Sequence, residues 1–214
     1  MPPNEPAIAT AADFRAAFDV SRETIDRLSA YLALLERWNP RINLVGGRTL
    51  PEAWSRHFAD SAQLLALAPP AARSWLDLGA GAGFPGAVVA ILAAETRPDL
   101  AVTLVESDGR KAAFLGAVAR ETGTPFAVLA ERIESLPPQA SDILSARALA
   151  PLAELLGHAE KHRRPEGTCL FPKGRSVHKE IADAALTWRF DPRIHRSRTD
   201  PDAAILEIGA FARA

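Results

Sequence analysis

Cysteine is almost absent from this chain of 214 residues, which contains a single one, Cys169. One thiol cannot close an intrachain disulfide, and it cannot supply the thiolate cluster of a structural metal site. Apolar runs near the roughly 20 residues that cross a bilayer are also missing, and the first residues lack the basic and then apolar order of a signal peptide. We therefore expect a cytoplasmic protein without membrane or metal partners, in which Cys169 lies in the core.

Net charge is nearly missing as well, because 25 Lys and Arg residues oppose 26 Asp and Glu residues and leave −1. Such a balance argues against a nucleic-acid binder, but the charges are unevenly distributed. Residues 158–198 hold ten Lys and Arg against five Asp and Glu, and four of the five histidines. The runs at 161–164 and 189–198 are either solvated surface or phosphate contacts, since one basic region can attract a polyanion to a near-neutral protein.

One stretch, from Ser74 to Gly86, stands out among the residues that are present, and it reads SWLDLGAGAGFPG. A short apolar run leads into three alternate glycines, Gly79, Gly81 and Gly83, and an alanine- and valine-rich stretch follows. This order predicts a buried strand, a tight turn and a helix N-terminus. Because glycine tolerates positive φ and has no Cβ to hold a ligand away from the backbone, we expect the turn to bind a nucleotide-like cofactor.

Strand and helix patterns alternate after this turn, which predicts an α/β fold. The expected strands are 75–78, 101–105, 126–129, 142–146, 168–171, 189–196 and 203–212, and the expected helices are 85–95, 108–121, 151–162 and 176–186. Right-handed crossovers then give a doubly wound, Rossmann-like sheet of seven mostly parallel strands with helices on both faces. We expect residues 71–214 to form this core and residues 1–70 to form a helical extension packed on it.

The extension begins with a Pro- and Ala-rich segment, residues 1–9, which we expect to be a loose arm. Ser21 is a candidate N-cap for a helix that runs to Trp38. Asn39-Pro40 is expected to end this helix, because the residue before a proline is biased away from the helical region. A pair of helices is expected between Leu50 and Leu67.

Dinucleotide sites share the strand–turn–helix order of this glycine turn, so a dinucleotide has to be distinguished from a sulfonium cofactor. A dinucleotide fingerprint has glycine at the sixth position of the turn, where this chain has Phe84. Phe84 would crowd a pyrophosphate, whereas a sulfonium can rest beside an aromatic face. Glu106, at the end of the second strand, can accept hydrogen bonds from both ribose hydroxyls of an adenosine. Asp77, inside the first strand, can either fix the turn or meet the ammonium of the cofactor through water.

These features favour an S-adenosylmethionine-dependent methyltransferase over an NAD(P)-dependent oxidoreductase. A third reading is a non-catalytic RNA-binding assembly factor that kept the fold. Such a protein would be expected to lose the Gly79–Gly83 turn and Glu106, and both are intact here.

Several segments together resemble a known family. They are DLGAGAGFPG at 77–86, VES at 105–107, KAAFL at 111–115, WNPRINL at 38–44, HFADS at 57–61, RIE at 132–134, SARA at 145–148 and PKG at 172–174. This set is similar to the bacterial small-subunit rRNA guanine-N7 methyltransferases, the RsmG proteins once called glucose-inhibited division protein B. The resemblance spans about residues 28–175, and it departs from the usual pattern at Pro40, where a lysine is common, and at Ser145-Ala-Arg-Ala, where many members have Ser-Arg-Ala.

The resemblance implies methylation of N7 of one guanine, position 527 in the usual rRNA numbering, in the 16S rRNA of the small ribosomal subunit, with S-adenosylmethionine as cofactor. It implies that Ile133 and Glu134 flank the adenine, and that Arg147 lies against either the methionine end of the cofactor or the incoming nucleotide. The expected cofactor-binding set is Gly79, Gly81, Gly83, Phe84, Glu106, Ile133, Glu134 and Arg147.

We expect no catalytic base, because guanine N7 offers an in-plane lone pair and carries no proton. Catalysis would then depend on proximity and alignment. Arg147 and Lys173 are the candidates for positioning the substrate, and Lys173 is expected to contact RNA. The expected partner is 16S rRNA or the small subunit, and the expected state is a monomer.

Three polar residues, His57, Asp60 and Ser61, fall on one helix face at i, i+3 and i+4. They either form a packing network between the extension and the sheet, or line the RNA side of the pocket. His158 and His162 are also four residues apart, but they have no third ligand nearby, so we expect no metal site there.

Overall fold

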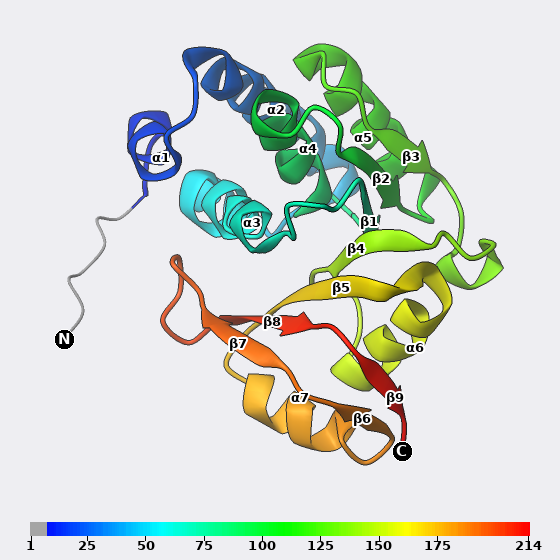
Figure 1. Ribbon diagram of the computed structural model, residues 1–214. Coiled ribbons are helices and arrows are strands. Elements are labelled where there is room, and N and C mark those ends of the chain that lie inside the picture. Colours follow the sequence, from blue (N-terminus) through cyan, green and yellow to red (C-terminus); the bar gives the residue numbers. More distant parts are fainter. Residues whose placement is uncertain (1–7) are drawn as a thin grey trace.

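The computed structural model describes residues 8–214, so all but the last two residues of the expected arm at 1–9 lie outside the described residues. A seven-stranded sheet with the strand order β3-β2-β1-β4-β5-β8-β7 forms the centre of the molecule (Figure 1). The strands are β1 Ser74–Leu78, β2 Ala101–Val105, β3 Ala127–Leu129, β4 Ser141–Ala146, β5 Arg163–Lys173, β6 Trp188–Phe190, β7 Arg193–Arg196, β8 Ala204–Ile208 and β9 Phe211–Arg213.

Helices precede the sheet and then alternate with its strands. They are α1 Ala11–Phe18, α2 Arg22–Ile42, η1 Leu50–Glu52, η2 Trp54–Ala59, α3 Asp60–Ala62, η3 Leu65–Leu67, α4 Gly86–Thr96, α5 Gly109–Thr122, η4 Ile133–Ser135, α6 Leu152–His162 and α7 Val177–Ala184. The expected strands and helices from 75 to 186 are therefore confirmed, with shifts of one or two residues at their ends, except that β5 extends well beyond the expected 168–171.

The sheet is mostly parallel, as expected. Strand β1 pairs in parallel with both β2 and β4, whereas β8 runs antiparallel to both of its neighbours, β5 and β7. The chain leaves β1 toward β3 on one side and returns to β4 on the other, so the strand order reverses between β1 and β4. Ligands of open α/β sheets bind beyond the carboxyl ends of the strands at such a switch point.

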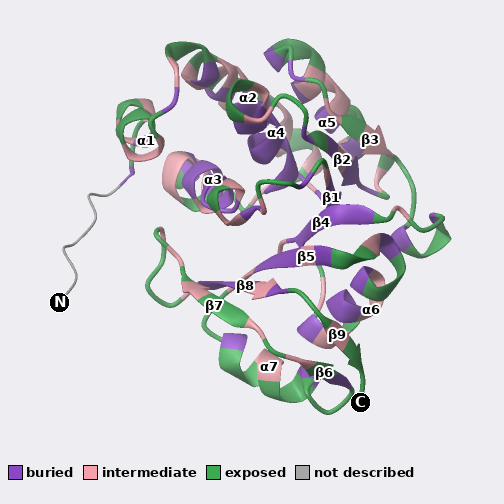
Figure 2. Ribbon diagram, viewed as in Figure 1, coloured by how far each residue is buried: buried purple, intermediate pink, exposed green. Residues whose placement is uncertain are grey.

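Both faces of the sheet are covered, which explains the nearly continuous apolar strands. Successive residues alternate between two hydrophobic clusters: Trp75 belongs to the cluster beneath α1–α5, and Leu76 belongs to the cluster beneath α6 and α7. Figure 2 shows the buried positions concentrated in the central strands and in α4. Cys169 is fully buried in the second cluster, and this burial raises the pKa of its thiol to about 12.

The expected end of the long helix at Asn39-Pro40 is wrong, because α2 continues to Ile42. Asn43 caps it in the left-handed region with φ 49°, and its N–H donates to the carbonyl of Asn39. Pro40 lies in the last turn, where it removes only one helical amide and its fixed φ is compatible with the helix. The preference of the residue before proline is therefore overridden.

The expected helix pair between Leu50 and Leu67 is a succession of short 3₁₀, π and α turns, η1, η2, α3 and η3. The C-terminal tail also differs from its two expected strands. Each of them is split, and β6 pairs with β9 in a separate two-stranded sheet. Pro192, which has no amide to donate, lies at the break between β6 and β7.

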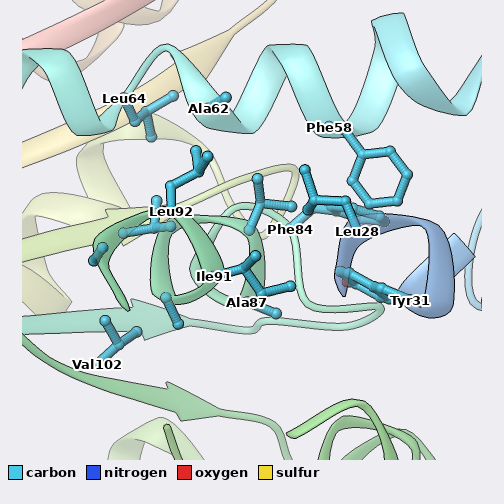
Figure 3. Packing of buried hydrophobic residues seen from close by; sticks show 14 of the residues in the cluster. Leu28, Tyr31, Phe58, Ala62, Leu64, Phe84, Ala87, Ile91, Leu92 and Val102 are labelled. Atoms are coloured by element: carbon cyan, nitrogen blue, oxygen red, sulfur yellow. The ribbon is translucent and has the colours of Figure 1, made fainter. Parts of the chain in front are cut away.

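The helices before β1 pack directly on the core. Leu28 and Tyr31 of α2 lie beside Phe58 of η2 and Phe84 of the glycine turn (Figure 3). The ring of Tyr31 stacks on Phe84 with centroids 5.4 Å apart, and its hydroxyl donates to the carbonyl of Ala82. The extension therefore holds the turn that follows β1.

Candidate functional site

A cavity of about 1310 Å³ opens at the carboxyl ends of β1, β2 and β4, at the switch point. One part of it is lined by the glycine turn, by Glu106 and by η4. The other part is lined by residues 44–49, by η2, and by the segments 172–183 and 197–205. The cavity therefore brings together the core and the N-terminal extension.

The glycine turn adopts a backbone that only glycine accepts easily. Gly79, Gly81 and Gly83 have φ values of 63°, 56° and 94°. A Cβ on Gly79 would lie 2.6 Å from a methyl of Leu149, whereas a Cβ on Gly81 would meet only one atom, 3.8 Å away. Gly81 thus presents open backbone to the cavity, as expected for a turn that a ligand approaches closely.

Glu106 is 7% exposed and lies beside this turn. Gly81 N–H donates to its Oε2 at 2.8 Å, and Asp108 N–H donates to its Oε1 at 2.7 Å. Because each carboxylate oxygen has two lone pairs, each retains one for a further donor such as a ribose hydroxyl. The bond to Gly81 also fixes the turn, a role that the sequence did not indicate.

Two roles were expected for Asp77, and the structure shows the first of them, fixing the glycine turn. Its side chain is fully buried, accepts from Gly86 N–H at 2.9 Å and from the Ser145 hydroxyl at 2.6 Å, and does not line the cavity. Ser145 in turn accepts from the indole of Trp75 at 2.8 Å. Burial raises the pKa of Asp77 to about 7, and the hydrogen bonds oppose that rise. Asp77 thereby ties β1 and β4 to the start of α4.

Phe84 lines the cavity, but its surroundings differ from our expectation of an aromatic face available to a sulfonium. The ring is 3% exposed and lies nearly parallel to Tyr31 and to His57, whose centroids are 5.4 and 4.9 Å away. The cation beside it is the guanidinium of Arg147, 5.0 Å from the ring centroid. Phe84 still lines the cavity, and its expected contact with the cofactor stays a prediction.

Arg147 follows β4 and joins the core to the extension. Its Nη1 donates to Asp60 Oδ2 and to the carbonyl of Arg56, both at 3.1 Å, and its Nη2 lies 3.3 Å from His57 Nδ1. The side chain is 20% exposed and lines the cavity. Its expected contact with the cofactor or with the nucleotide stays a prediction.

His57 is neutral in this arrangement, since burial and then the charge of Arg147 lower its pKa to about 4. A neutral ring accepts from Arg147 at Nδ1 and donates from Nε2–H to Thr49 Oγ1, 2.9 Å away. The Thr49 hydroxyl then donates to the carbonyl of Gly46. This chain of hydrogen bonds anchors residues 44–49 to the end of β4, and Thr49 is a participant that the sequence did not reveal.

Asp60 anchors a second segment, residues 197–200, to the same point. Its Oδ1 accepts from the Thr199 hydroxyl at 3.1 Å, while its Oδ2 binds Arg147. The His57–Asp60–Ser61 face is thus divided: the first two side chains line the cavity and hold Arg147, and Ser61 is fully buried without a hydrogen-bond partner for its hydroxyl. The fold brings Thr199 to Asp60, and no local sequence signal could have indicated this contact.

Ile133 and Glu134 lie in η4 and line the cavity at the end of β3, as expected for residues that flank an adenine. Their carbonyls are held from α6, by His162 Nε2 at 3.1 Å and by Lys161 Nζ at 2.7 Å. Burial lowers the pKa of His162. Among the described residues, no group of three or more His, Cys, Asp or Glu could hold a metal ion.

Lys173 is held by protein groups. Its ammonium donates to Glu180 Oε2 at 2.7 Å and to the carbonyl of Ala150 at 3.1 Å, and its side chain is only 8% exposed. Its expected contact with RNA stays a prediction. This charge is compensated inside the protein. Lys173 lines the cavity as a brace between β5, α7 and the loop after β4.

The basic stretch 158–198 is compensated in part. Its ion pairs include Arg164–Asp142, Lys173–Glu180, Arg175–Asp202, Lys179–Asp183 and Arg193–Glu207. Both side chains are exposed in two of these pairs, Arg175–Asp202 and Lys179–Asp183, so each of these two contributes little to stability and its cation can exchange partners. No helix within residues 8–214 is both long and apolar enough to span a membrane.

Known proteins similar to this chain cover nearly its whole length. The ribosomal RNA small subunit methyltransferase G of Rhodospirillum centenum is 54% identical over 202 residues, which are 94% of this chain and 91% of the relative. The protein of the same name from Cereibacter sphaeroides is 52% identical over 197 residues, 92% of this chain and 96% of the relative.

Solved structures identify the fold. A putative class I S-adenosylmethionine-dependent methyltransferase from Listeria monocytogenes superposes with a TM-score of 0.64 at 12% identity, over 93% of this chain and 72% of that one. The fold is therefore the Rossmann-like fold of class I methyltransferases. The profile of the family described as GidB, rRNA small subunit methyltransferase G, matches residues 24–200. With this match and relatives at about half identity, the chain belongs to the GidB family of small-subunit rRNA methyltransferases.

Proposed function

We propose that this protein transfers a methyl group from S-adenosylmethionine to N7 of a guanine in 16S rRNA. The observation that carries the proposal is the pairing of Gly81 with Glu106 at the switch point of the sheet. There, open glycine backbone and a carboxylate with unused lone pairs face one cavity, in a member of an rRNA methyltransferase family.

The cofactor would be held mainly by the chain after β1, β2 and β3. The backbone at Gly79 and Gly81 would lie against it, Glu106 would accept from its ribose hydroxyls, and Ile133 and Glu134 would flank its adenine. When bound, S-adenosylmethionine supplies a methyl group on a positively charged sulfur. The residues present fit this ligand, since they offer an open turn and hydrogen-bond acceptors.

The acceptor would enter the other part of the cavity, between residues 44–49 and 197–205. Guanine N7 has a free lone pair, so no residue needs to remove a proton. The task of the protein is to hold the base and the methyl donor in line at about 3–3.5 Å. Arg147, fixed by Asp60 and His57, would set the wall against which they align.

The same proposal includes the partner, the oligomeric state and the cellular location of the protein. We expect the protein to act as a monomer in the cytoplasm on 16S rRNA or on the small subunit. An RNA enzyme of this kind reads exposed bases in loops together with RNA shape.

Ligand binding tests the cofactor. S-adenosylhomocysteine is expected to raise the melting temperature of the protein, and NAD is expected to leave it unchanged, because a dinucleotide needs space where Phe84 lies. A rise with NAD and none with S-adenosylhomocysteine would reject the methyltransferase assignment.

Methyl transfer tests the acceptor atom. Labelled methyl groups should appear in 16S rRNA, free or in the small subunit, and borohydride and aniline should then cleave the chain at the modified 7-methylguanosine. Label without cleavage would show that another atom is methylated. Binding of RNA without any label on either substrate would favour the non-catalytic assembly factor.

A further inference from the structure

Six cationic side chains line the cavity, and the structure sorts them into three groups. They are Arg56, Lys111, Arg132, Arg147, Lys173 and Lys179. The first group, Arg147 and Lys173, is mostly buried and paired with Asp60 and Glu180. These two cations are compensated within the protein.

The second group, Lys111 and Arg132, lies at the cofactor end. Lys111 belongs to the first turn of α5, just after Glu106, and Arg132 immediately precedes Ile133. The third group consists of Arg56 in η2 and Lys179 in α7, which line the acceptor part of the cavity. An RNA acceptor would bring its charged backbone to this part of the cavity.

Arg56 combines an anchored backbone with a side chain open to solvent. Its carbonyl accepts from Arg147 Nη1 at 3.1 Å, which fixes the main chain at the cavity wall. Its guanidinium side chain is 53% exposed, and within residues 8–214 its one ion-pair contact is with Glu52, one helical turn away, at 3.9 Å. Both members of this contact are exposed, so the interaction contributes little and is easily exchanged.

Lys179 has a similar arrangement in α7, in another segment that lines the cavity. Its neighbour Glu180 is fixed by the buried ammonium of Lys173. The side chain of Lys179 is 78% exposed and pairs with Asp183, also one helical turn away, at 2.6 Å. The backbone at or next to each of the two cations is therefore held by a side chain of the cavity wall, while the cation itself is exposed.

We propose that Arg56 and Lys179 bind backbone phosphates of the RNA on either side of the nucleotide that enters the cavity. This inference rests on the proposed function and assigns the contacts that hold its acceptor. An RNA phosphate can replace Glu52 and Asp183 as the partner of each cation. The inner pairs, Arg147–Asp60 and Lys173–Glu180, remain intact, so phosphate binding leaves the wall of the cavity unchanged.

Salt dependence of RNA binding tests the inference directly. Each phosphate contact on single-stranded RNA contributes about 0.7 to the slope of log K against log salt. Arg56→Ala and Lys179→Ala are each expected to lower that slope by about this amount and to raise the KM for RNA several-fold. Affinity for S-adenosylhomocysteine should stay at the wild-type value. Arg56→Lys should recover most of the slope, since it restores the charge.

Arg37→Ala is the matched control, because Arg37 is an exposed arginine of the same extension that does not line the cavity. It removes the same charge and should leave slope and KM at the wild-type values. Equal effects of Arg37→Ala and Arg56→Ala would overturn the inference in favour of a general charge effect, and wild-type slopes in both cavity variants would overturn it outright. If wild-type protein transfers no methyl group at all, the proposed function fails instead.

Discussion

Asp77 is a carboxyl group fully enclosed between β1, β4 and the start of α4, and this enclosure makes the stability of the protein depend on pH. Burial raises its pKa from the ordinary value of 3.8 to about 7. The native state therefore holds a proton that the unfolded chain has already released. This contribution to stability is complete below pH 4 and is lost as the pH rises through 7, by about 4 kcal/mol for a shift of this size.

Asp77→Asn should remove that dependence, because an amide of the same shape can still accept from Gly86 N–H and donate to Ser145. His57, with its pKa lowered from 6.5 to about 4, acts in the opposite direction, because its contribution to stability rises as the pH rises from 4 to 6.5. The quantity to compare is therefore the difference in unfolding free energy between variant and wild type, from urea titrations between pH 4.5 and 8. A constant difference across this range would contradict the assignment.

Glu106 is the residue whose loss should separate ligand binding from folding. Glu106→Ala removes the acceptor of two backbone N–H groups and of the expected ribose contact. At about 1.5–3 kcal/mol for a hydrogen bond to a charged group, affinity for S-adenosylhomocysteine should fall by about 10- to 100-fold in calorimetry.

Asp108→Ala is the control for this substitution. Asp108 caps α5 through its side chain and does not line the cavity. Its loss should cost about 1 kcal/mol of stability and leave ligand affinity unchanged. Unchanged affinity in Glu106→Ala would remove Glu106 from the site.

At the scale of elements, helix α2 supports the cofactor turn through one hydroxyl. Tyr31 donates to the carbonyl of Ala82 and is completely buried, and this burial raises its pKa well above 10. Tyr31→Phe keeps the ring stack on Phe84 but leaves a buried carbonyl unpaired, so unfolding free energy should fall by about 1–3 kcal/mol. Because the turn loses a tether, S-adenosylhomocysteine should also bind more weakly.

Thr122→Val provides the comparison, since it removes another buried hydroxyl, one that donates to Val118 within α5. It should lower stability without changing ligand affinity. The link between the extension and the turn would be contradicted if both variants bound the ligand as wild type does.

The sheet was predictable from the sequence because its strands and helices are each encoded locally. The apolar run before Gly79 and the alternation that follows it determine the order of elements, and handedness rules then leave few arrangements. The failures have two causes. Pro40 is accommodated in the last turn of α2, where packing overrides the local preference. Helix α1 begins with a capping box of Thr10 and Asp13, a local signal that our prediction did not use.

At the scale of the whole molecule, the cofactor part of the site was more predictable than the acceptor part. The turn and Glu106 lie within one strand–helix–strand unit, so their spacing in the chain already implies proximity. Asp60 bonds to Arg147, which lies 87 residues away in the chain, and to Thr199, which lies 139 residues away. Nothing in the local sequence indicates that these three residues meet. The ion pair of Lys173 with Glu180 of α7 was equally hidden, because nothing near Lys173 in the sequence indicates that partner.

The division of the chain at residue 70 stays a prediction. The packing of the core indicates whether residues 71–214 can fold without the extension. Helix α4 is buried over its whole circumference from Gly86 to Ala93, which is typical of a helix enclosed by protein on all sides. One side of α4 faces the sheet, and α2 and α3 cover much of the rest. The extension is therefore part of the core on that face.

A chain of residues 71–214 should consequently fail to fold alone, because removing α2 and α3 exposes the apolar side of α4 and the hydrophobic cluster beneath α1–α5. We expect aggregation on size exclusion, strong dye binding to exposed apolar surface and no cooperative thermal transition. A chain of residues 20–214, which loses only α1, should keep a cooperative transition at a lower melting temperature. A monomeric 71–214 chain that unfolds cooperatively would show instead that the core is independent and that the extension serves only the acceptor.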